Sequence, residues 1–227
     1  MKYLLTSQGL RTPEILQACE KLVGKPASEI SVAVVNEAYA VEIGDKRWNV
    51  EEISNTSKVL GGELDLVDLL SLDEEQIMQR VACKDVIFVV GGNTDYLRSV
   101  YRKSGFEKVL TSLPNNKVYV GSSAGSMVLG IRLPGASRGV LYNDQEIFGT
   151  ESYLEFFDFS FVPHLDGDEF FNCRRDIVME NLATFAPLTY CLRDDQALSI
   201  ENGEVSFVGG TPLVIRNGEI ISETSVE

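Results

Sequence analysis

The sequence is poor in basic residues and in histidine, and it contains no long apolar run. Lys and Arg number 20 against 34 Asp and Glu, which gives a formal net charge of −14 at pH 7. Such a chain is repelled by nucleic-acid phosphates and by anionic membrane surfaces. No apolar run approaches the roughly 18 residues of a membrane helix, and the first residues lack the apolar core of a secretion signal. We therefore expect neither nucleic acid nor a membrane as a partner.

Cysteine is also scarce, and its spacing excludes the usual metal and redox motifs. The four cysteines, Cys19, Cys83, Cys173 and Cys191, form no CxxC pair, and no histidine is spaced to complete a zinc site. The dinucleotide fingerprint GxGxxG and the lysine of a Walker motif are absent as well. We expect reduced thiols in a cytoplasmic protein, with no metal and no organic cofactor.

What the chain does contain is the pattern of an α/β protein. With 227 residues, 44% of them hydrophobic, it can build one core, and we expect a single domain over residues 1–227. Short β-branched apolar runs alternate with amphipathic stretches, which is typical of parallel strands joined by crossover helices. The expected strands are Tyr3–Thr6, Ser31–Val35, Glu63–Asp68, Val86–Val90 and Val118–Gly121, with helices over Pro13–Leu22 and Asp73–Val81.

The last third of the chain changes character. After a helical stretch near Glu169–Thr184 come two Asn-Gly dipeptides, which favour hairpin turns because both turn positions take positive φ. They predict two hairpins that close one edge of the sheet. The hairpin strands are Leu198–Ile200 with Val205–Val208 and Leu213–Ile215 with Ile220–Ile221. The predicted fold class is α/β, with three layers around a mostly parallel sheet and antiparallel hairpins at the C-terminal end.

The sharpest functional signal is a Gly-x-Ser-x-Gly motif between a strand and a helical stretch. Residues 118–127 read VYVGSSAGSM, so that Ser123 stands between Gly121 and Gly125. A nucleophilic serine on such a turn is held in a strained conformation, and only small neighbours let the strand and the helix cross closely. We predict Ser123 as a nucleophile, with the N–H of Ala124 available to hold an oxyanion. The alternative is a tight packing turn or a phosphate-binding turn.

A serine nucleophile needs a base, and His164 is the one histidine of the sequence. It follows a strand-like run that ends in proline, which places it at a sheet edge. A carboxylate should orient the imidazole, and the strand-like run Leu188–Leu192 leads directly to Asp194 and Asp195. The interval between Ser123 and His164 is too short for an α/β-hydrolase, so the order serine, histidine, acid is favoured, with either aspartate as the acid.

A second glycine motif, Gly91-Gly92-Asn93-Thr94, directly follows a predicted strand and opens a helix. Paired glycines at a strand end let the backbone approach a ligand closely, so the N–H of Gly92 is a candidate second oxyanion donor. Taken alone, the motif could equally cradle a phosphate.

The sequence resembles the peptidase E (α-aspartyl dipeptidase) and cyanophycinase family of serine peptidases. The resemblance is carried, in this order and at these spacings, by Gly91-Gly92-Asn93-Thr94, Gly121-Ser122-Ser123-Ala124-Gly125 and Pro163-His164. It spans nearly the whole chain and implies a fold similar to class I glutamine amidotransferases, with serine in place of cysteine at the elbow. It also implies an oxyanion role for Gly92. The family acid is usually glutamate, and the matching position here is Asp194, with Asp195 adjacent.

The resemblance also indicates residues that contact the substrate. Asn143-Asp144 is similar to an Asn-Asp pair of peptidase E, which implies that Asp144, together with Asn93, shapes the site. Peptidase E recognises an N-terminal aspartate with basic residues, and an arginine fork would suit that carboxylate. The candidates are Arg174 and Arg175, with Arg132 and Arg138 nearer the elbow.

These features predict a serine peptidase that uses a Ser-His-Asp triad to remove the N-terminal residue, aspartate by resemblance, from dipeptides or short peptides. A small peptide is then the one expected partner, and the sequence indicates no particular oligomeric state. Two alternatives stay open. The same chemistry could act on β-aspartyl or cyanophycin-like peptides, or the fold could serve as a non-catalytic module that binds a small anion.

Overall fold

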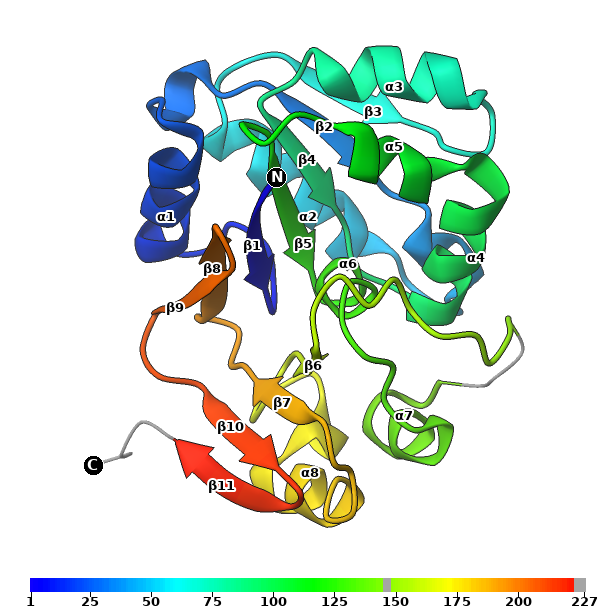
Figure 1. The fold of residues 1–227 in the computed structure, drawn as a ribbon, viewed down its shortest axis with the longest axis vertical. Coiled ribbons are helices and arrows are strands. Elements are labelled where there is room, and N and C mark those ends of the chain that lie inside the picture. The colour runs from blue at the N-terminus through cyan, green and yellow to red at the C-terminus, as the bar shows by residue number, and fades with distance from the viewer. Residues whose placement is uncertain (145–147, 223–227) are drawn as a thin grey trace.

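The centre of the computed structural model, which describes residues 1–144 and 148–222, is a seven-stranded sheet in the order β3-β2-β4-β5-β1-β8-β9 (Figure 1). The strands are β1 Lys2–Thr6, β2 Val32–Val35, β3 Leu64–Val67, β4 Val86–Val89, β5 Val118–Ser122, β8 Ala197–Glu201 and β9 Glu204–Val208. β1 to β5 run parallel, whereas β8 and β9 are antiparallel to their neighbours. The sheet is therefore mostly parallel, with an antiparallel edge.

Helices cover both faces of this sheet. They are α1 Pro13–Val23, α2 Arg47–Val59, α3 Glu74–Ala82, α4 Thr94–Ser104, α5 Phe106–Ser112 and α6 Ala124–Met127, with 3₁₀ turns η1 Ala27–Glu29 and η2 Ala38–Val41. Helices α7 Gly135–Tyr142 and α8 Arg175–Asn181 and the 3₁₀ turn η3 Phe171–Cys173 pack against one another beyond the end of this sheet (Figure 1). Within the described ranges, no helix is long and apolar enough to cross a membrane.

Alternate residues of each parallel strand enter two separate cores, because successive side chains point to opposite faces. In β4, Val86 and Phe88 pack in a cluster with residues of α1 and α2. Ile87 and Val89 pack in the other cluster, with residues of α3, α4, α5 and α6. Both faces of the strand are buried, which explains why its sequence is apolar throughout.

A second sheet of four strands, in the order β11-β10-β7-β6, lies beyond one end of the first (Figure 1). Its strands are β6 Phe159–Val162, β7 Leu188–Cys191, β10 Leu213–Arg216 and β11 Glu219–Ser222. β6 and β7 are parallel, and β10 is antiparallel to both β7 and β11. The chain passes from β7 directly into β8, so the two sheets are joined at this point.

The predicted three-layer, mostly parallel fold is confirmed, with one correction. β8 and β9 form the predicted hairpin at the sheet edge, and Asn202 and Gly203 have the expected positive φ of 54° and 82°. The second predicted hairpin forms from β10 and β11, but it belongs to the second sheet rather than to the edge of the first. Its partner is β7, and the Asn-Gly signal carries no information about such a distant pairing.

The predicted helix starts are also confirmed. The side chain of Thr12 accepts the N–H of Ile15 and caps α1, and Asp73 forms a capping box with Gln76 at the start of α3. The helical stretch expected near Glu169–Thr184 is shorter and consists of η3 and α8. Helix α2 was not singled out from the sequence, because its apolar residues are few and irregularly spaced.

The close packing of α6 against β4 can be tested by substitution. A Cβ on Gly125 would lie 2.3 Å from the carbonyl oxygen of Val89, whereas one on Gly139, in α7, would come no closer than 3.6 Å to any heavy atom outside its helix. We expect Gly125→Ala to lower the free energy of unfolding by about 2 kcal/mol or more. Gly139→Ala should be neutral or stabilising, because alanine favours helix. Urea denaturation measures both, and equal effects would contradict the packing.

Candidate active site

Ser123 lies on the sharp turn between β5 and α6, and β5 is an inner strand of the central sheet. Its backbone has φ 48° and ψ −110°, a region that L-residues rarely occupy. The neighbouring strand holds this turn, because the carbonyl of Thr6 accepts the N–H of Ser123 at 3.1 Å and the hydroxyl of Ser126 at 2.9 Å. The strained serine is thus fixed at the carboxyl end of β5.

His164 follows β6 in the second sheet, and its ring reaches Ser123. Its Nε2 lies 3.0 Å from Oγ of Ser123, and its Nδ1 lies 2.7 Å from Oδ1 of Asp194. The ring is buried and stacks on the ring of Phe170, with the two centroids 3.9 Å apart. Contacts at both ring nitrogens and on the ring face therefore fix its orientation.

The structure distinguishes the two aspartates that the sequence left open. Asp194 contacts the His164 ring, whereas Asp195 forms an ion pair with Arg193 at 3.4 Å and its side chain is 57% exposed. Burial opposes the ionisation of Asp194, but hydrogen bonds from His164 and Ser7 outweigh it and lower its pKa below the ordinary value. Asp194 is therefore the ionised neighbour of the imidazole.

Ser7, directly after β1, completes this arrangement and was missed from the sequence. Its buried hydroxyl donates to Oδ1 of Asp194 at 2.7 Å and accepts the backbone N–H of His164 at 2.7 Å. The available signal was its position, because polar residues that follow parallel strands gather at one edge of the sheet.

The Gly91-Gly92 turn follows β4 and lies against the elbow. A Cβ on Gly91 would be 3.2 Å from Cβ of Ser123, and Gly92, with φ 133°, lies against the backbone of Ala38. Ala124 opens α6, where a first-turn N–H has no acceptor within the helix. The predicted oxyanion donors, the N–H groups of Gly92 and Ala124, thus belong to two segments that meet at Ser123.

Asn93 and Asp144, both predicted to contact substrate, lie together. Asn93 caps α4 by accepting the N–H of Tyr96 at 2.9 Å, and its Nδ2 donates to Asp144 at 3.3 Å. Asp144 also pairs with Arg138 at 3.4 Å. Burial nevertheless raises the pKa of Asp144 to about 6.

Arg132 and Arg138 serve the framework around this pair. Both bind the buried carboxylate of Asp95, at 3.1 Å and 2.8 Å respectively, and Arg138 is fully buried. Neither belongs to the described residues that line the cavity around Ser123.

Arg174 and Arg175, the arginines predicted to bind substrate, also lie outside this cavity. The guanidinium of Arg174 donates to the carbonyl of Asp166 at 2.9 Å, and the backbone N–H of Arg175 donates to the Asp166 carboxylate at 3.1 Å. The substrate contact expected of these two arginines therefore stays a prediction, and neither is among the described residues that line the cavity.

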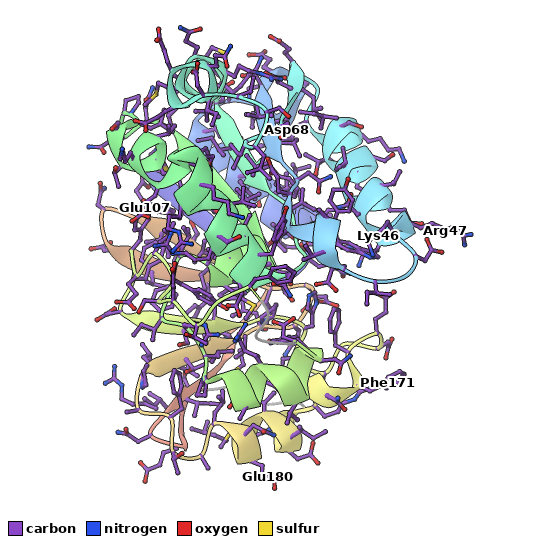
Figure 2. All side chains as sticks on the ribbon, turned by 90° about the vertical axis from the view of Figure 1, so that its right-hand side faces the viewer. Lys46, Arg47, Asp68, Glu107, Phe171 and Glu180 are labelled. Carbon is purple, nitrogen blue, oxygen red and sulfur yellow. The ribbon has the colours of Figure 1, made fainter. Side chains whose placement is uncertain are left out.

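A cavity of about 320 Å³ opens above Ser123 and His164, and its wall is acidic. The carboxylates that line it are Glu42, Glu51, Glu52, Asp144 and Glu169, whereas Arg11 is the only Lys or Arg among the described lining residues. Arg47, where α2 begins, points into solvent (Figure 2), whereas the ammonium group of the preceding residue, Lys46, donates to the carbonyl of Gly44 at 3.2 Å. In the described part of the chain, no group of three or more His, Cys, Asp or Glu side chains is placed to hold a metal ion.

Helix α2 supplies a large part of this wall, which sequence reasoning did not foresee. Its cavity-lining residues are Trp48, Glu51, Glu52, Asn55 and Thr56. They come from a stretch without a recognisable motif, so only the packing of α2 near the elbow identifies them.

A serine on a strand-to-helix turn, in contact with a histidine that in turn contacts a carboxylate, is the arrangement of the Ser-His-acid hydrolases. The chain belongs to peptidase family S51, whose model matches residues 3–208. The resemblance inferred from the glycine, serine and histidine motifs is thereby confirmed, and the protein is a peptidase.

Known relatives support this membership. The chain is 23% identical to an uncharacterized peptidase of Pasteurella multocida over 75% of its own length and 82% of that protein. It is 24% identical to an uncharacterized peptidase of Listeria monocytogenes over 82% of its own length and 85% of that protein.

Two crystal structures share the fold. A protein named provisionally as a peptidase E, from Listeria monocytogenes EGD-e, has a TM-score of 0.71 and 22% identity, covering 91% of this chain and 96% of that one. A peptidase from an acI-B1 Actinobacterium has a TM-score of 0.66 and 17% identity, covering 98% and 96%.

The role of Ser7 in holding the site can be tested by its removal. Ser7→Ala leaves the buried N–H of His164 without its acceptor and removes a donor from Asp194. We expect the free energy of unfolding to fall by about 1–3 kcal/mol. Ser206→Ala, which removes an exposed hydroxyl that donates to the Ser199 carbonyl, should change it by less than about 0.5 kcal/mol. Thermal denaturation of both variants measures these changes in stability. Equal losses of stability in the two variants would exclude a structural role for Ser7.

Proposed function

We propose that the protein is a serine peptidase that hydrolyses short peptides with Ser123, His164 and Asp194 as its triad. The observation that carries the proposal is the continuous contact from Ser123 Oγ to His164 Nε2, 3.0 Å, and from His164 Nδ1 to Asp194 Oδ1, 2.7 Å. Such a series of contacts activates the serine hydroxyl, which is otherwise a weak nucleophile. Its position in a cavity gives a substrate access to the serine.

Each residue of the site then has a defined task. Ionised Asp194 accepts the Nδ1–H of His164, which leaves Nε2 free to take the proton of Ser123 as its oxygen attacks the peptide carbonyl. The N–H groups of Gly92 and Ala124 hold the oxyanion of the tetrahedral intermediate. His164 returns the proton to the leaving amine, and then activates a water molecule that hydrolyses the acyl-enzyme.

The cavity supports a short peptide as the substrate. At about 320 Å³ it is near the lower end of the range for small-molecule sites, which favours a dipeptide or the N-terminal end of a short peptide. A cavity wall with more carboxylates than cations does not attract anions, so it does not favour the alternative of a module that binds a small anion.

The charge of the wall also bears on which residue is removed. Specificity for N-terminal aspartate, expected from the resemblance, would rest on Arg11. Glu42, Glu51 and Glu169 of the same wall instead favour a second class of substrate, peptides whose N-terminal residue carries a cationic side chain in addition to its ammonium group.

A dipeptide panel tests the function and its substrate class. We expect hydrolysis of Xaa-Leu dipeptides by the wild type and none by Ser123→Ala, because the nucleophile is missing. We expect kcat/KM for Arg-Leu to exceed that for Asp-Leu by about tenfold, a difference of about 1.4 kcal/mol in binding the transition state. A preference for Asp-Leu that is lost in Arg11→Ala would instead establish aspartate specificity, and β-aspartyl-leucine tests the β-linked alternative.

The identity of the acid is tested by two substitutions of adjacent residues. Asp194→Asn should lower kcat by a factor on the order of 10⁴, because an amide neither fixes the productive tautomer nor stabilises the imidazolium. Asp195→Asn should change kcat by less than about threefold, since this side chain faces solvent. Comparable losses in the two variants would refute the assignment of Asp194.

A further inference from the structure

Glu52, in the middle of α2, places a carboxylate beside the elbow that the mechanism above does not use. It lines the cavity around Ser123 together with Ser122 and Gly91. Ser122 directly precedes the nucleophile, and Gly91 lies against Cβ of Ser123. Glu52 thus shares the cavity with both segments that carry the proposed oxyanion donors.

The other side of this carboxylate faces the loop that follows β1. Its Oε1 is buried without a hydrogen-bond partner among the described residues, and a Cβ on Gly9 would lie 2.9 Å from it. A buried carboxylate oxygen without a donor is costly when charged. Burial accordingly raises the pKa of Glu52 to about 7, although Ser122, Gly91 and Arg11 all lower it.

We propose that Glu52 is a positioning residue of the peptidase, which in its neutral form holds the Gly91-Gly92 turn against the elbow so that both oxyanion donors converge on Ser123. This proposal rests on the function proposed above. When Glu52 ionises, a negative charge develops beside the position of the oxyanion and disfavours the tetrahedral intermediate. The charged and titratable groups that share the cavity are Arg11, which favours the ionised form, and Glu42, Glu51, Asp144, Glu169 and His164.

The consequence is an alkaline fall in the pH profile of activity. Activity should fall above about pH 7, where the raised pKa means that Glu52 passes from neutral to charged. Glu52→Gln retains a hydrogen-bond acceptor of the same shape but cannot ionise. We expect this variant to lose the alkaline fall.

The test measures the rate constant for labelling by a fluorophosphonate from about pH 5 to pH 9, together with kcat for the best dipeptide. The matched control is Glu37→Gln. Glu37 is also a carboxylate with one buried, unpartnered oxygen and a pKa raised to about 7 by burial, but it does not line the cavity. This variant should retain the alkaline fall. Persistence of the fall at the same pH in Glu52→Gln, or its absence from the wild type, would overturn the proposal.

A second variant keeps the proposal testable if Glu52→Gln folds poorly. Ser122→Ala removes a group that lowers the pKa of Glu52, so the alkaline fall should move to higher pH, by about half a unit. An unmoved fall would contradict the proposal. Failure of the underlying function is distinguishable, because a folded wild type would then neither react with the fluorophosphonate nor hydrolyse any dipeptide.

Discussion

One chain of hydrogen-bonding contacts, from Ser7 through Asp194 and His164 to Ser123, unites the two sheets at the site. The four residues directly follow or lie close behind the carboxyl ends of four different strands, β1, β7, β6 and β5. Neither sheet alone supplies all four residues, because β6 and β7 belong to the second sheet and β1 and β5 to the first. The placement of the second sheet at the end of the first therefore brings His164 and Asp194 to the strained turn at Ser123.

Hydrogen-bond donors determine which carboxylates near the nucleophile are ionised. Asp194 receives donors from Ser7 and His164, and they outweigh its burial and lower its pKa. Glu52 is also buried, but its Oε1 has no donor in the described part of the chain, so burial prevails and raises its pKa to about 7. Environments that separate the pKa values of neighbouring acids allow them different tasks. Here one carboxylate orients the histidine as an anion, and we propose that the other supports the oxyanion turn as a neutral acid.

Local signals in the sequence predicted the parallel strands, the helix caps and the serine elbow, because each depends on residues close together in the chain. The meeting of His164 with Ser123 was also inferable, since the chain offers one histidine and both residues end a strand. The choice of Asp194 over Asp195 came from the family resemblance and not from the residues themselves, because it depends on which of two adjacent side chains faces the ring. Ser7 and helix α2 were missed for a similar reason: their roles arise from tertiary packing and have no motif. The same limit misplaced the hairpin of β10 with β11, because its pairing with β7 depends on residues far away in the sequence.

Locating the site of covalent labelling tests the central claim most directly, namely that the contacts of His164 and Asp194 activate Ser123. The wild type would be treated with a fluorophosphonate and the modified peptide identified by mass spectrometry, with His164→Ala treated in parallel. Modification of Ser123 alone, slowed by at least about a hundredfold in His164→Ala, is the expected result. A folded wild type that stays unmodified, or that is modified at another serine, would contradict the claim.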